Sequence, residues 1–197
     1  LWSDSAYMGP PFLAYYGWVT QNQSLVQMAF DELKLQRSAL HRPQDPGRHL
    51  WRHIIEFPNN TKATRAIDAR VWLTGNGWAA AGMLRVAAII SHSPWADKMQ
   101  AQHDQLVQWA DDIITAAYQF VDPGTGLLLN AIDDPSTFLD GSGSALLSYA
   151  VFRLASMDQG RKKHVDMAEK AYQTLSKSLN SLSPVSYTHL TLPTICS

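Results

Sequence analysis

The sequence contains a single cysteine, no long apolar run and no cluster of basic residues. Cys196 has no partner within the chain, so no intrachain disulfide holds the fold together. Arg85 and Arg153 interrupt the two most apolar stretches, and no stretch reaches the roughly 18 residues of a membrane-spanning helix. The net charge of −1 offers no electrostatic attraction to nucleic acid or to an anionic membrane. We therefore expect a soluble globular protein with no nucleic-acid partner and no membrane partner.

The usual signatures of cofactor binding are missing as well. The sequence has no Walker loop, no dinucleotide-binding glycine pattern and no Gly-x-Ser-x-Gly elbow. His49 and His53 have apolar neighbours that favour an extended segment over residues 49–57, where the two side chains would lie roughly 13 Å apart. No third ligand follows at a suitable spacing, so we expect no metal and no cofactor. His53 is either a hydrogen-bonding contact to a substrate or a structural histidine.

Two kinds of helix alternate along the chain. Residues 8–19, 78–90 and 145–155 are apolar nearly all round, which indicates buried helices. Each is followed by an amphipathic helix whose apolar residues recur at three- and four-residue steps. These residues are Val26, Ala29, Phe30, Leu33 and Leu40, then Leu106, Ala110, Ile113, Ala117 and Val121, then Val165, Ala168, Tyr172, Leu175 and Leu179. Three inner-outer helix pairs predict an all-α fold, either a solenoid or a closed toroid.

Three clusters of polar and aromatic residues sit just before the three buried helices: Trp2-Ser3-Asp4, residues 72–78 and residues 140–144. If the inner helices run parallel, their N-termini share one rim and the clusters surround one cleft. Unpaired backbone N–H groups and helix dipoles at that rim favour an anion, and an acidic sugar would fit.

Asp4 is the strongest catalytic candidate. An acid beside Trp2 and ahead of a buried helix would be partly desolvated by the ring, which favours its protonated form and suits it to deliver a proton. The same position also suits a helix N-cap. Trp72 and Trp78 are expected to form a binding wall, because a flat ring packs well against the C–H face of a sugar. Burial in the core is the alternative for each tryptophan.

More polar residues precede the third buried helix. Asp133, Asp134 and Asp140 offer carboxylates, but Asp-Pro and Asp-Gly are also ordinary turn dipeptides. Ser142 and Ser144 either cap the helix or donate to a substrate carboxylate, and the two roles can coexist.

Taken together, these segments resemble a known enzyme family. Residues 1–13 look like the Trp-x-Asp-x-x-(Tyr/Phe)-Met segment of the unsaturated rhamnogalacturonyl hydrolases, glycoside hydrolase family 105. Residues 72–78 are similar to that family's Trp-x-Arg-Gly-Asn-Gly-Trp, and residues 133–144 resemble its Asp-x-Pro … Glu-Thr-Ser-Gly-Ser-Ala stretch. The resemblance covers roughly residues 1–180 and implies about the second half of an (α/α)6 barrel, a partial toroid of three inner-outer pairs.

The resemblance implies a hydrolase that removes a 4,5-unsaturated uronic acid from the non-reducing end of pectin-derived oligosaccharides. The family's reaction starts with hydration of the C4=C5 bond: an aspartate protonates C4, activated water adds at C5, and the hemiketal rearranges to release the sugar. One proton-shuttling acid is enough, unlike in ordinary two-carboxylate glycosidases. Carried over by motif, the roles are general acid/base for Asp4, pocket shaping for Trp2 and Met8, substrate contact for His53, and aromatic walls for Trp72 and Trp78.

The sequence departs from the family pattern at Thr74, which stands where the motif often has an arginine and cannot grip a carboxylate with two charged hydrogen bonds. The family's second aspartate belongs to the N-terminal half, so we expect the chain alone to be inactive. Two other functions stay open. One is a non-catalytic carbohydrate-binding or helical scaffold, and the other is a conventional glycosidase that uses Asp4 with Asp134 or Asp140.

The two ends of the chain carry their own expectations. It begins at Leu1, inside the first motif, so we expect a fragment of a longer protein. Residues 1–182 should form the partial barrel. Residues 183–197 should be a non-native or disordered tail, because they are rich in Ser, Thr and Pro and resemble translated sequencing-adapter sequence. The sequence leaves open whether the protein is secreted or cytoplasmic, and its oligomeric state.

Overall fold

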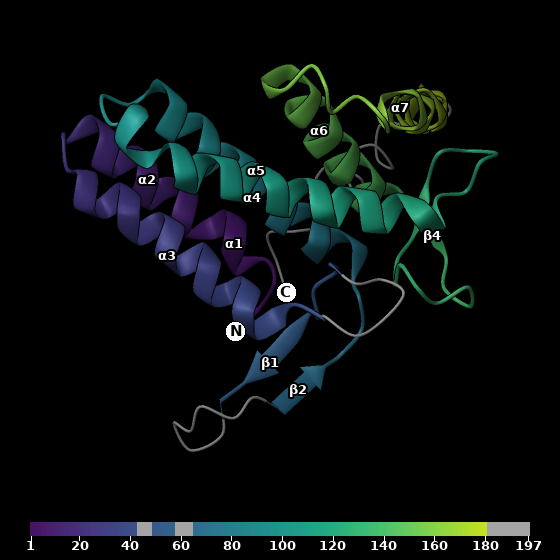
Figure 1. Cartoon of the computed structure of the whole chain (residues 1–197). Coiled ribbons are helices and arrows are strands. Elements are labelled where there is room, and N and C mark those ends of the chain that lie inside the picture. The colour runs from purple at the N-terminus through teal and green to yellow at the C-terminus, as the bar shows by residue number, and fades with distance from the viewer. Residues whose placement is uncertain (43–48, 58–64, 181–197) are drawn as a thin grey trace.

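The computed structural model describes residues 1–42, 49–57 and 65–180, which form a mostly helical molecule (Figure 1). These residues contain seven α-helices: α1 (Ser5–Met8), α2 (Pro10–Val19), α3 (Gln23–Leu40), α4 (Leu73–His92), α5 (Gln100–Ala117), α6 (Gly141–Met157) and α7 (Val165–Asn180). They also contain two antiparallel strand pairs, β1 (Ile54–Glu56) with β2 (Arg65–Asp68) and β3 (Leu128–Leu129) with β4 (Leu139–Asp140). Short 3-10 helices, Asp97–Met99 and Tyr118–Phe120, flank α5. Within these ranges every helix is too short or too polar to span a lipid bilayer.

The helices pack as three pairs, which confirms the predicted alternation of inner and outer helices. α2 packs on α3, α4 on α5, and α6 on α7. α4 contacts both α2 and α6, and Figure 1 shows the α2–α3 pair and the α6–α7 pair on opposite sides of α4 and α5. α4 is buried nearly all round, and its exposed residues are Arg85, Ser91 and His92.

The outer helices bury most of the residues that the sequence assigns to their inner faces. All five predicted positions of α3 are buried, as are the four predicted positions within α5. The prediction for Tyr172 in α7 is wrong, because this side chain is 59% exposed while Ala168 and Ala171 are fully buried. The small alanine side chains let α7 approach α6 closely, and the bulky ring lies outside that contact.

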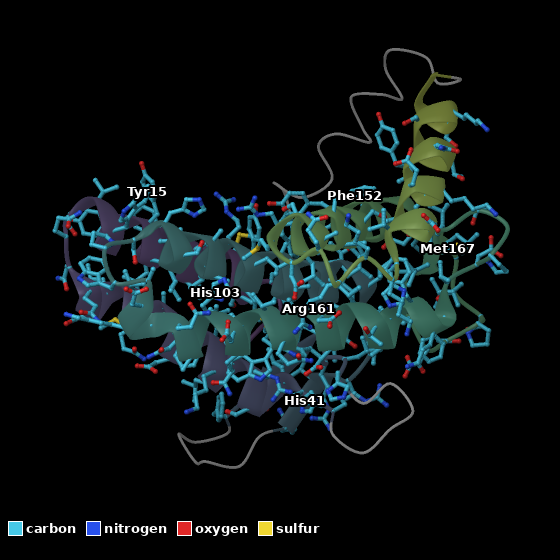
Figure 2. All side chains as sticks on the ribbon, turned by 45° about the horizontal axis from the view of Figure 1, so that its top comes forward. Tyr15, His41, His103, Phe152, Arg161 and Met167 are labelled. Atoms are coloured by element: carbon cyan, nitrogen blue, oxygen red, sulfur yellow. The ribbon has the colours of Figure 1, made fainter. Side chains whose placement is uncertain are left out.

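The first inner segment differs from its prediction in two ways. The single helix expected over residues 8–19 is divided at Gly9, because Pro10 and Pro11 have no backbone N–H for a continuous helix and instead occupy the first turn of α2. The aromatic side chains of α2 are also not buried. Phe12, Tyr15 and Tyr16 are between 51% and 67% exposed, and Figure 2 shows Tyr15 pointing away from the ribbon. One face of α2 is therefore buried, and the face that carries these rings is exposed.

The polar motifs before the second and third inner helices begin at the N-caps, Trp72 and Asp140, and continue into the helices themselves. α4 begins at Leu73 rather than Trp78, and α6 begins at Gly141 rather than Ala145. Asp140 is the N-cap of α6, where its carboxylate accepts from the backbone N–H of Gly143 (3.0 Å). Tertiary contacts therefore extend both helices through residues of weak helix propensity.

The extended segment expected over residues 49–57 is confirmed in part as β1, whose partner β2 the sequence analysis did not predict. The N-terminal residues run beside β1: the Leu1 ammonium group donates to the Ile55 carbonyl (2.6 Å), and the Ser3 N–H donates to the His53 carbonyl (2.9 Å). A turn follows at residues 122–126, where the Asp122 carboxylate accepts from the Thr125 N–H (2.8 Å). The predicted tail from residue 183 lies outside the described residues.

Gly82 permits the close contact between α1 and α4. A Cβ atom at Gly82 would lie 2.2 Å from the backbone oxygen of Ala6 and 2.8 Å from its carbonyl carbon. We expect Gly82→Ala to lower the free energy of unfolding by about 2 kcal/mol, because α1 must shift and the cost exceeds the gain in helix propensity. Urea titration measures the change. Gly9→Ala is the matched control, since nothing lies within 4 Å of its added Cβ, and equal stability losses in the two variants would contradict the prediction.

Candidate active site

The three sequence motifs meet at the N-terminal ends of α1, α4 and α6. Gly75, in the first turn of α4, packs against Ser3, and a Cβ there would lie 2.1 Å from the Ser3 hydroxyl oxygen. The Thr74 hydroxyl donates to the Asp140 carboxylate (3.4 Å) at the start of α6. The start of α4 is tied to the segment between β3 and β4, since the Leu73 N–H donates to the Asn130 carbonyl (2.8 Å).

Asp4 faces His53 across the junction between α1 and β1. The Asp4 Oδ2 atom lies 3.9 Å from the His53 Nε2 atom, and the two side chains are 23% and 14% exposed. Both atoms are buried, and neither has a hydrogen-bond partner among the described residues. Asp4 precedes α1, but its side chain makes no capping hydrogen bond. Asp4 thus occupies the N-cap position of α1, as the alternative interpretation expected, but its carboxyl group makes no capping bond and is left for another use.

Asp68 holds the other side of the His53 ring. Its Oδ2 atom lies 2.9 Å from the His53 Nδ1 atom, and the register of the hairpin pairs Asp68 with Ile54, next to His53. Hydrogen bonds from the Arg70 guanidinium group, and then from His53, hold the pKa of Asp68 well below its usual range, although burial acts in the opposite direction. The Asp68 side chain is thus an ionised acceptor at neutral pH.

Two of the predicted tryptophans surround His53. The Trp72 ring centroid lies 4.5 Å from that of His53 at a tilted angle, and the Trp2 ring meets His53 edge-on at 5.6 Å. Trp2 is 52% exposed and Trp72 is partly exposed, so both rings remain accessible to a ligand. These rings give the Asp4–His53 pair aromatic neighbours on two sides.

Trp78 and Met8 lie in a different part of the junction. The Trp78 ring packs on Tyr7 with 4.6 Å between centroids, and Arg85 donates to the Tyr7 hydroxyl group (2.5 Å). Met8 is 57% exposed and lines an open groove of about 710 Å³ between α1, α2, α4 and α6, whose lining also includes Tyr7, Phe12 and Arg153. The structure thus brings Asp4, His53, Trp2 and Trp72 together, and it gives Trp78 no ring contact with His53.

Asn76 fixes the position of the His53 segment relative to α4. Its Nδ2 group donates to the carbonyls of Trp51 (3.0 Å) and Trp72 (2.9 Å), and its Oδ1 atom accepts from the Trp51 N–H (2.8 Å). The side chain is 1% exposed, and Trp51 is fully buried in the core. Asn76 therefore serves as a buried cross-link, and Trp51 is a core residue.

The polar residues at the start of α6 have structural partners. The Asp140 carboxylate accepts from the Asn130 amide (2.9 Å) and from the Ser142 hydroxyl group (2.7 Å), in addition to its capping bond. Ser144 is fully buried, and its oxygen accepts from the Leu128 N–H (2.9 Å). The cap of α6 is Asp140, so the prediction that Ser142 or Ser144 caps the helix is wrong. This geometry gives Ser144 a structural role and leaves Ser142 exposed at the rim.

The remaining carboxylates and histidine lie in other surroundings. Asp133 pairs with Arg42 (2.9 Å), and Asp134 accepts from the hydroxyl group and the N–H of Ser136 within its own turn. His49 lies 3.7 Å from Asp112, on the side of α5. Within the described ranges, no three His, Cys, Asp or Glu side chains gather as metal ligands.

The sequence pattern did not predict roles for Asp68, Arg70 and Asn76. Asn76 lies within the second motif, where nothing in the sequence marks its amide as a buried cross-link. Asp68 and Arg70 lie in a stretch without clear strand alternation, so no pattern predicted β2 or its pairing with β1. Chemistry alone could have predicted a second partner for His53, because a hydrogen bond to one ring nitrogen of a histidine fixes the role of the other.

Known structures share this fold. A possible member of glycoside hydrolase family 105 from Salmonella enterica superposes with a TM-score of 0.78 at 22% identity, covering 93% of this chain and 45% of that chain. A family 88 glycosyl hydrolase from Bacteroides vulgatus gives 0.69 at 18%, covering 90% and 49%. The unsaturated glucuronyl hydrolase of Bacillus sp. GL1, responsible for glycosaminoglycan degradation, gives 0.68 at 18%, covering 90% and 46%.

These neighbours confirm the α/α toroid, of which the chain spans just under half the length. The chain also matches a sequence model of one family over residues 1–192, which include all three motifs. With its toroidal helix pairs and its motifs gathered at one rim, the chain belongs to Glycosyl Hydrolase Family 88.

Proposed function

We propose that the protein containing this chain removes a 4,5-unsaturated uronic acid from the non-reducing end of a pectin-derived, rhamnogalacturonan-type oligosaccharide. The observation that carries the proposal is the Asp4–His53 pair, with its two facing atoms 3.9 Å apart and unpartnered among the described residues. The rings of Trp2 and Trp72 flank the pair, and a pyranose packs well against such rings.

The proposed reaction needs a single acid. Protonated Asp4 gives its proton to C4 of the double bond, and the resulting carboxylate takes a proton from the water that attacks C5. The product is a hemiketal, which opens and releases the rest of the oligosaccharide, and Asp4 ends the cycle protonated. His53 contacts the sugar, and Trp2 and Trp72 hold its ring. General acid–base catalysis of this kind contributes about 10²- to 10⁴-fold to a rate.

The residue at position 74 bears on substrate choice. Thr74 is buried and donates to Asp140, so this position supplies no cation for the uronate carboxylate. Met8, Trp78, Ser142 and the helix N-termini at the rim are the remaining proposed contacts. The glycosaminoglycan substrate named for the Bacillus neighbour makes unsaturated glucuronyl saccharides the second substrate class to be tested.

Activity is proposed for the full-length protein. The chain spans between 45% and 49% of the three neighbours named above, and the family's second aspartate is expected in the half that it lacks. We propose that the 197-residue chain alone turns over no substrate.

A conventional glycosidase would need a second free carboxylate, and the geometry gives this alternative little support. Among the described residues before α6, Asp140 is 5% exposed and accepts four hydrogen bonds, while Asp134 is held in its own turn. The other alternative is a non-catalytic carbohydrate-binding scaffold, which would bind saccharides without turnover.

One experiment separates the three functions. The full-length protein is incubated with unsaturated rhamnogalacturonan and glucuronyl disaccharides and with their saturated counterparts. We expect the absorbance of the conjugated uronate to fall as free sugar appears, with no cleavage of the saturated compounds. Cleavage of both kinds would favour the conventional glycosidase, and binding of either kind without cleavage would favour the scaffold.

A further inference from the structure

We propose that Asp68 is a positioning residue for His53, and that it fixes the imidazole as the tautomer with its proton on Nδ1 and a bare Nε2 atom turned toward Asp4. The proposal rests on the proposed function only for its effect on turnover. The tautomer itself is a property of the unliganded protein.

Asp68 and His53 are in hydrogen-bond contact. The Asp68 Oδ2 atom lies 2.9 Å from Nδ1, and both side chains are largely buried, at 16% and 14% exposed. Arg70 donates to the same carboxylate from its side chain and from its backbone N–H (3.0 Å). Since these bonds lower the pKa of Asp68, the carboxylate is ionised and can only accept. The bond to His53 therefore requires a proton on Nδ1.

The other ring nitrogen of His53, Nε2, faces Asp4. A neutral imidazole with its proton on Nδ1 has an acceptor lone pair on Nε2. That atom is buried and lies 3.9 Å from Asp4 Oδ2, which is also buried and unpartnered among the described residues. Nε2 can therefore accept from a protonated Asp4 carboxyl group or from a sugar hydroxyl group.

Backbone hydrogen bonds and two neighbouring rings hold the His53 side chain in this orientation. The His53 N–H donates to the Arg70 carbonyl (3.0 Å), and the His53 carbonyl accepts from the Ser3 N–H (2.9 Å). Trp72 lies 4.5 Å from the ring and Trp2 5.6 Å from it. The N-terminal segment, β1 and the end of β2 thus hold one geometry in which Asp68 faces the Nδ1 atom of His53 and Asp4 faces its Nε2 atom.

The test compares Asp68→Asn with the wild type in the full-length protein, by nitrogen-15 NMR of the imidazole and by steady-state kinetics. An asparagine amide can donate to Nδ1, which moves the proton to Nε2 and turns the acceptor facing Asp4 into a donor. We expect the wild type to show the Nδ1–H tautomer at pH about 8. The variant should show a substantial Nε2–H population, a fall of about 100-fold or more in kcat, and a much smaller change in KM.

Glu56→Gln is the matched control, because it removes the ion pair of Glu56 with Arg65 on the same hairpin and touches neither His53 nor Asp68. We expect this variant to keep the wild-type imidazole spectrum and kcat. A wild-type spectrum with the proton on Nε2 or with a doubly protonated ring, or an unchanged tautomer in Asp68→Asn, would overturn the proposal. Because the spectra need no substrate, they decide it even where the wild type turns over none of the tested saccharides.

Discussion

Replacing Asp4 with asparagine is expected to lower kcat on an unsaturated uronyl disaccharide by about 1000-fold, because the amide has no proton to deliver to C4 at neutral pH. Asparagine has the same shape as aspartate, and the Asp4 side chain makes no capping hydrogen bond in the structure. Stability should therefore stay within about 0.5 kcal/mol of wild type. The measurement follows the loss of the conjugated absorbance in the full-length protein.

Asp134→Asn is the control for this prediction. The Asp134 carboxylate accepts hydrogen bonds from Ser136 within its own turn, so its replacement should leave turnover close to wild type. An Asp4→Asn variant that retains a rate within about threefold of wild type would rule out proton delivery by Asp4.

The largest expected effect on stability comes from Asn76→Ala. The substitution removes three hydrogen bonds and leaves the buried N–H and carbonyl groups of Trp51 without their partner. The Trp72 carbonyl keeps its bond from the backbone of residue 76. At about 2 kcal/mol for each orphaned buried group, the free energy of unfolding should fall by about 4 kcal/mol.

Gln100→Ala provides the comparison for Asn76. The Gln100 amide donates to Asp104 (2.7 Å) on the exposed face of α5, where water can replace the bond. Urea titration of the two variants should show a loss below about 0.5 kcal/mol for Gln100→Ala. A similarly small loss for Asn76→Ala would mean that the first turn of α4 is not held by this amide.

Much of the fold follows from the hydrophobic pattern. Apolar residues all round α4 and on one face of α3 predict inner and outer helices, because burial dominates helix packing. The prediction fails for α2, where Phe12, Tyr15 and Tyr16 stay exposed. The periodicity of apolar residues shows which face of a helix is apolar. It does not show whether a neighbouring element covers that face.

Most predicted site residues lie close to helix starts, and the unpredicted one lies where the chain folds back. Asp4, Trp2, His53 and Trp72 were candidates from the sequence, and the structure brings them together. Asp68 was not a candidate, because a short irregular hairpin has little sequence signature and places it beside His53 only in three dimensions. Trp78 was a candidate for a binding wall and Ser144 for a helix cap or a donor to a substrate carboxylate. The structure shows the Trp78 ring packed on Tyr7, and the Ser144 oxygen accepting from the Leu128 N–H.

The central claim is that Asp4 delivers a proton to an unsaturated sugar held beside His53. Its most direct test is a crystal structure of the full-length Asp4→Asn variant with an uncleaved unsaturated disaccharide. The account predicts that C4 of the unsaturated ring lies within about 3.5 Å of the side chain at position 4, with the ring against Trp72. A disaccharide bound instead in the groove between Phe12 and Arg153, with C4 out of contact with position 4, would contradict it.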